Sequence, residues 1–94
     1  MTFEEFNETL ALGKHPKNIS RVLESLWEDR RGHWGRAHEL AQEEDNISGA
    51  HVHAYLHRKE GDIANAEYWY NRARTTKPSI SLDQEWELLV REFL

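Results

Sequence analysis

The chain has 94 residues, enough for one domain but too few for two domains that each bury a core of their own. Apolar residues make up 38% of it, which predicts a compact fold rather than disorder. Seventeen acidic residues against 12 basic ones predict no nucleic-acid partner, because a protein neutralises duplex phosphates with basic side chains. The absence of cysteine excludes disulfides, iron–sulfur clusters and cysteine-ligated zinc.

The sequence also predicts no membrane partner. The longest aliphatic run is Leu88–Val90, which is far too short to span a bilayer. The first residues of the sequence include Glu4, Glu5 and Glu8, whereas a signal peptide would carry basic residues there, followed by an apolar stretch. We therefore expect a soluble, cytoplasmic protein, and its size suggests a bacterial one.

Apolar residues recur with a period near 3.6 in almost every segment, which predicts an all-α fold of five to six helices. In chain order, the predicted helices span about residues 2–12, 18–31, 34–44, 46–60, 63–75 and 81–94. Thr2, Asp62 and Ser81 are suited to cap helix starts, and Gln84 can complete a capping box with Ser81. The connections are short, which predicts antiparallel neighbours.

The two middle hairpins echo each other at an offset of 29 residues, from Gly32 to Gly61. In each, a glycine ends one helix and an alanine follows five residues later, which allows a tight turn and close helix packing. The second hairpin resembles a tetratricopeptide (TPR) repeat over about 34 residues, 47–80. The residues at the turn, alanine, aromatic, alanine and proline positions of the motif are Gly61-Asp62, Ala66, Tyr70, Ala73 and Pro78.

The TPR resemblance implies helices stacked as TPR-like hairpins within a single domain, 1–94. Its parts are an N-terminal helix (1–13), a first hairpin (18–45), a second hairpin (47–77) and a C-terminal capping helix (81–94). We expect the core to be dominated by Trp27, Trp34, Tyr70 and Trp86.

The chain is also similar to a family of small bacterial proteins of about this length. The similarity rests on Leu26-Trp27, Arg31–Trp34, Arg36–Glu39, Val52–Arg58, Glu60–Asp62, Asn65-Ala66, Tyr68–Tyr70 and Glu85-Trp86. It covers roughly residues 20–94. This resemblance supports the fold and implies no activity and no site residue.

His53 and His57 lie one turn apart on one predicted helix, so both imidazoles can bind a single metal ion. The spacing is that of the two histidines in HExxH, but Ala54 stands where that motif has its general-base glutamate. His51 points nearly the opposite way. We prefer to interpret the pair as histidines packed between helices and hydrogen-bonded there. The alternative is a site for one divalent transition metal ion.

A metal site would need a third ligand from elsewhere in the fold. Glu60, Glu67 or His38 is suitable only if the fold brings it near His53 and His57.

A candidate binding surface lies on the side of the same helix that we expect to be exposed. His51, Tyr55 and Arg58 follow one another by about one turn there, at positions that line the concave face of a repeat array. Trp69 belongs to the aromatic run Tyr68–Tyr70, which cannot all face inward. Trp69 is therefore expected either to cover the last helix or to help form a binding or self-association surface.

The function predicted first is a non-enzymatic protein–protein interaction or scaffold module, whose partner is another protein or peptide. No catalytic set is recognisable, so we expect no catalytic residues and no cofactor. The first alternative is a metal-binding or metal-dependent hydrolytic protein that uses His53 and His57. The second is a self-assembling structural subunit, because the aromatic residues are numerous for so small a domain.

Overall fold

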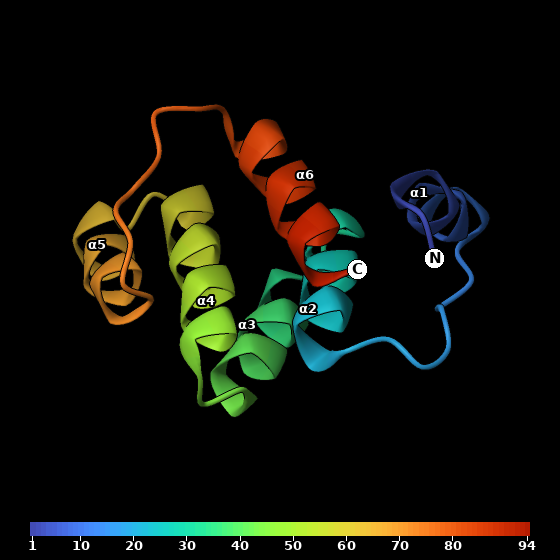
Figure 1. Cartoon of the computed structure of the whole chain (residues 1–94), viewed down its shortest axis with the longest axis horizontal. Helices are drawn as coiled ribbons and strands as arrows, with labels where there is room; N and C mark the ends of the chain where they lie inside the picture. Colours follow the sequence, from blue (N-terminus) through green and yellow to red (C-terminus); the bar gives the residue numbers. More distant parts are fainter.

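A computed structural model describes all residues 1–94 and contains six α-helices and no β-strand. The helices are α1 (Phe3–Leu12), α2 (Arg21–Arg30), α3 (Trp34–Glu43), α4 (Ile47–Glu60), α5 (Ile63–Arg72) and α6 (Leu82–Phe93). This confirms the predicted all-α class. The molecule measures 35 × 25 × 21 Å, and α1 and α5 lie at opposite ends of its longest axis (Figure 1). None of the six helices combines the length and the apolar character needed to cross a bilayer.

Three helix starts follow the predicted capping residues, whereas α2 begins at Arg21 with Ser20 as its cap and not near residue 18. Thr2 and Ser81 each form a complete capping box, with Glu5 and Gln84 at the third helical position. The side chain of Asp62 accepts a hydrogen bond from the backbone N–H of Asn65 and so caps α5. Local sequence signals therefore set where these three helices begin.

The end of α5 differs from the prediction. We expected this helix to reach Thr75, but it ends at Arg72 because Arg74 adopts a left-handed φ of 61°. The N–H of Arg74 donates to the carbonyl of Asn71, and the N–H of Thr75 donates to that of Tyr70, which closes the helix as a Schellman motif. Residues 73–81 then form a connector that leads across to α6 (Figure 1).

The main core lies where α2, α4 and α6 meet, and side chains of α1 and α3 complete it. Trp27 and Trp86 are 4% and 3% exposed, in agreement with their predicted place in the core. Trp34 is only partly buried and packs against the edge of this cluster. A second, smaller cluster of Ala54, Ala66 and Tyr70 joins α4 to α5.

Close packing also fixes the junction between α3 and α4. A β-carbon on Gly49 would lie only 1.9 Å from the backbone oxygen of Glu44, so no larger residue fits there without a shift of the backbone. Asn46 accepts a hydrogen bond from the N–H of Gly49 and caps α4 at the same place. The two features together hold α3 against α4, and the candidate site lies between these helices.

Candidate metal centre

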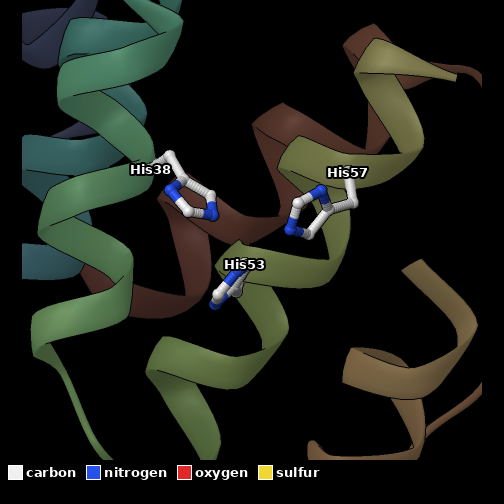
Figure 2. Close-up of side chains that lie close together, drawn as sticks. All are labelled: His38, His53 and His57. Carbon is white, nitrogen blue, oxygen red and sulfur yellow. The ribbon is translucent and has the colours of Figure 1, made fainter. Parts of the chain in front are cut away.

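Three histidines from two helices meet between α3 and α4. His38 comes from α3, and His53 and His57 come from successive turns of α4. Each offers one ring nitrogen, and these nitrogens all lie within 4.8 Å of one another. Figure 2 shows the rings of His38 and His57 turned toward each other across the gap between the helices, with His53 beside them. The fold therefore supplies His38 as a third donor for the pair that the sequence spacing places on one face.

The three rings are in mutual contact. The ring centroid of His38 is 4.5 Å from that of His53 and 5.1 Å from that of His57, and both pairs pack edge to face. The rings of His53 and His57 are stacked with centroids 4.8 Å apart. A cluster this tight places three lone-pair donors around one small volume.

Two indole rings close the cluster on either side. Trp34 stacks on His38 with a centroid distance of 5.0 Å, and Trp69 stacks on His53 at 3.9 Å. The indole N–H of Trp34 donates to the backbone carbonyl of Leu56, which fixes this ring on α4. The histidines are thus surrounded by aromatic carbon, and water is excluded from much of the cluster.

This environment favours neutral imidazoles. Burial, together with repulsion from the neighbouring His38 and His57, lowers the pKa of His53 to about 4. Burial, followed by repulsion from His57, also lowers the pKa of His38 from its usual 6.5. At neutral pH, His38 and His53 are therefore uncharged, and an uncharged imidazole is the form that binds a metal.

Only one of the three rings has hydrogen-bond partners among the other side chains. Nδ1 of His57 lies 2.7 Å from a carboxylate oxygen of Glu60, and Nε2 of the same ring lies 3.4 Å from the amide nitrogen of Asn65. His38 and His53 form no hydrogen bond to the protein, so the preferred sequence interpretation of hydrogen-bonded histidines does not describe them. Both rings therefore keep nitrogen atoms that no other protein group occupies.

An ion has a route to the cluster. No fully buried side-chain nitrogen lacks a hydrogen-bond partner, so the free nitrogens of His38 and His53 are in contact with solvent. His53 also lines a hollow of about 240 Å³ between the end of α3 and α5. Trp69, Arg72 and Glu44 are among the residues around this hollow. The donors are thus sheltered by aromatic rings but not sealed.

The geometry fits a divalent transition metal after a small contraction. Zinc–nitrogen bonds of about 2.0–2.1 Å in a tetrahedral site separate the nitrogens by roughly 3.4 Å. The donor atoms lie within 4.8 Å of one another, so they would have to move closer together to hold one ion. Three imidazoles leave one tetrahedral position open, as in catalytic zinc sites. Ala54 still stands where an HExxH site has its glutamate, so this helix supplies no general base of that type.

The other predicted third ligands are placed differently. Glu60 bonds to Nδ1 of His57 and belongs, with Asp62, to a separate group of possible ligands at the exposed side of that ring. Glu67 belongs to neither group. His51 points away from the cluster, and its Nε2 is 3.9 Å from the carboxylate of Glu85 on α6.

The predicted binding face of α4 is not exposed. Tyr55 is only 2% exposed, and its hydroxyl donates to Asp29 at 2.8 Å. Arg58 donates to the buried carboxylate of Glu85 at 2.8 Å. The reason is that α6 and the end of α2 cover this face. Tyr55 and Arg58 therefore form hydrogen bonds within the fold and are not available to a partner. His51 and Trp69 remain partly exposed.

Sequence reasoning missed the groups that surround the histidines. The four-residue spacing of Trp34 and His38 on one helix was a signal for a stacked pair. Nothing in the sequence indicated that Asn65 would reach His57, or that Asp29 and Glu85 would be buried. These contacts depend on how separate helices are placed.

Comparisons with known proteins give no match for this chain. No protein-family model matches it, and neither a curated protein nor a solved structure matches it. Any functional conclusion therefore depends on the chemistry of the side chains described above.

Proposed function

We propose that this protein binds one divalent transition metal ion through His38, His53 and His57. The observation that carries the proposal is the convergence of three imidazole nitrogens, from two helices, within 4.8 Å. Three nitrogen donors favour Zn²⁺, Cu²⁺, Ni²⁺ or Co²⁺ over Mg²⁺ and Ca²⁺, which prefer oxygen ligands. Bound in this way, the ion would link α3 to α4 and stabilise the folded state.

The proposal predicts that protein purified without a histidine tag binds one equivalent of Zn²⁺ in a calorimetric titration. His38 is the ligand to remove first, because it is the least buried of the three and its loss disturbs the packing least. His38→Ala is expected to lose this binding. In thermal unfolding, Zn²⁺ at one hundred times its Kd should stabilise the parent by about 2.7 kcal/mol and leave the variant unchanged.

His33→Ala is the matched control for His38→Ala. His33 precedes α3 directly, is exposed and lies outside the cluster, so this variant should bind Zn²⁺ like the parent. A parent that binds no Zn²⁺, or three proteins that bind it equally, would overturn the proposal.

A second candidate function is the protein-interaction or scaffold role predicted from the sequence. We propose for it a TPR-like stacking of the helices, supported by the left-handed φ of 90° at Gly61 and by the burial of Ala66 and Tyr70 at motif positions. The specific observation in its favour is Leu88, which is 59% exposed on α6. Leu88 lines a hollow of about 380 Å³ together with Pro78 and other residues of the connector.

Self-association is the simplest form of this second candidate. If the surface around Leu88 joins two copies, the parent should sediment as a dimer at micromolar concentration, and Leu88→Glu should sediment as a monomer because it buries a charge in the contact. Glu87→Gln, one residue away on α6, is the control and should behave like the parent. A parent that remains monomeric throughout this range rules out self-association.

A further inference from the structure

The ring of His57 is held between two polar side chains of opposite hydrogen-bonding character. Nδ1 is 2.7 Å from Oε1 of Glu60, and Nε2 is 3.4 Å from Nδ2 of Asn65. An ionised carboxylate only accepts hydrogen bonds, whereas an amide nitrogen only donates them. Both contacts are satisfied together when the ring donates its Nδ1–H to Glu60 and accepts from Asn65 with the lone pair of Nε2.

This pair of contacts selects one tautomer of His57. A metal ion binds the lone pair of a neutral imidazole, and in the selected tautomer that lone pair is on Nε2. Metal-binding histidines generally donate their other N–H to a carboxylate or carbonyl, which orients the ring and makes the ligating nitrogen more basic. Glu60 stands in that relation to His57. Asn65, in contrast, competes for the nitrogen that the metal needs.

The positions of both partners follow from the helices. Glu60 is three residues after His57 and ends α4, so the two side chains share one helix face. Asn65 lies in the first turn of α5, where its backbone N–H bonds to the cap residue Asp62. The turn at Gly61 therefore brings Asn65 back against the ring that Glu60 orients.

We propose that Glu60 is a positioning residue of the metal site and that Asn65 opposes binding at the same ring. Glu60 holds His57 with Nε2 available to the ion, while Asn65 occupies that nitrogen until the ion displaces it. The balance of the two contacts sets the affinity for the metal. This inference rests on the proposed metal-binding function and concerns how the site is tuned.

The proposal makes the two substitutions act in opposite directions. Glu60→Ala removes the acceptor for Nδ1–H, and it is expected to weaken Zn²⁺ binding about 10- to 100-fold, as is usual for the loss of such a partner. Asn65→Ala removes one neutral hydrogen bond that binding has to break, and it is expected to tighten binding about two- to tenfold. If the two residues only supported packing, both substitutions would weaken binding.

Two further variants separate the hydrogen bond from the charge. Glu39 contributes a negative charge near His38, as Glu60 does, but it bonds to no histidine. Glu39→Ala should therefore change the Zn²⁺ affinity much less than Glu60→Ala. Glu60→Gln keeps an oxygen that can accept from Nδ1, so its affinity should fall between those of the parent and Glu60→Ala.

The tautomer gives a test that needs no metal. Nitrogen-15 NMR of the histidine rings distinguishes a protonated Nδ1 from an unprotonated one. His57 in the metal-free parent should show a protonated Nδ1, and Glu60→Ala should shift the population toward the other tautomer. This signal would not move if Glu60 acted only on the stability of α4.

The results also distinguish this inference from the proposed function. A parent that binds no Zn²⁺ overturns both. A parent that binds Zn²⁺, with Glu60→Ala equal to Glu39→Ala or with an unchanged tautomer of His57, overturns the role of Glu60 alone. Weaker binding by Asn65→Ala overturns the role of Asn65.

Discussion

Replacing Trp86 with alanine is expected to destabilise the fold by about 3–5 kcal/mol, the usual cost of removing a buried tryptophan. The ring is 3% exposed and contacts Phe3 and Phe6, with centroid distances of 5.9 and 6.1 Å. Its indole N–H donates to the backbone carbonyl of Leu26 at 2.9 Å. The guanidinium of Arg30 lies over the ring, 3.9 Å from its centroid. One side chain of α6 thus holds α1 and α2.

Urea unfolding followed by circular dichroism measures this loss. A domain of this size is stable by roughly 5–15 kcal/mol, so the variant should unfold at much lower urea concentration than the parent. Leu88→Ala is the control on the same helix, because Leu88 is largely exposed and its loss should cost little. Equal midpoints for the two variants would show that α6 does not depend on Trp86 for its place in the fold.

The helices were largely predictable because their signals are local. Apolar spacing, the caps at Thr2 and Ser81, and the glycine at position 61 each act within a few residues. The early end of α5 was missed because Arg74 takes a left-handed conformation. Arginine rarely adopts this conformation, and the neighbouring residues give no signal that predicts it.

The candidate site was predictable only in part, for a similar reason. The spacing of His53 and His57 places them on one face of a helix in any fold. His38 joins them only because α3 packs on α4, and a sequence without a structure offers three equally suitable third ligands. Tyr55 was expected on an exposed face because nothing local shows that Asp29, 26 residues away, would accept its hydroxyl.

The second large effect concerns pH. Lowering the pH from 7 toward 4 is expected to cost the metal-free protein up to about 3 kcal/mol of stability through His53. The pKa of this residue falls from 6.5 in the unfolded chain to about 4 in the fold, mainly because of burial. One pKa unit corresponds to about 1.4 kcal/mol. His38, whose pKa is also lowered by burial, adds to the loss in the same direction.

The sign follows from proton binding. Between pH 6.5 and 4 the unfolded state binds a proton at His53 that the folded state does not, so acid favours unfolding throughout this window. Well above pH 6.5 both states are neutral at this residue and it contributes no slope. About 2 kcal/mol should already be lost at pH 5, where most carboxylates still remain ionised.

Urea midpoints measured between pH 7.5 and 5 for the parent and for His53→Gln test this expectation. Glutamine does not titrate, so the variant should be less stable at neutral pH but should lose less stability as the pH falls. Zn²⁺ should make the parent at pH 7 more stable and its decline toward pH 5 steeper, because protons and the metal compete for the same nitrogens. Parallel curves for parent and variant would mean that His53 takes up its proton as readily in the folded protein as in the unfolded chain. The fold would then not favour the neutral form of this imidazole, which is the form that binds a metal.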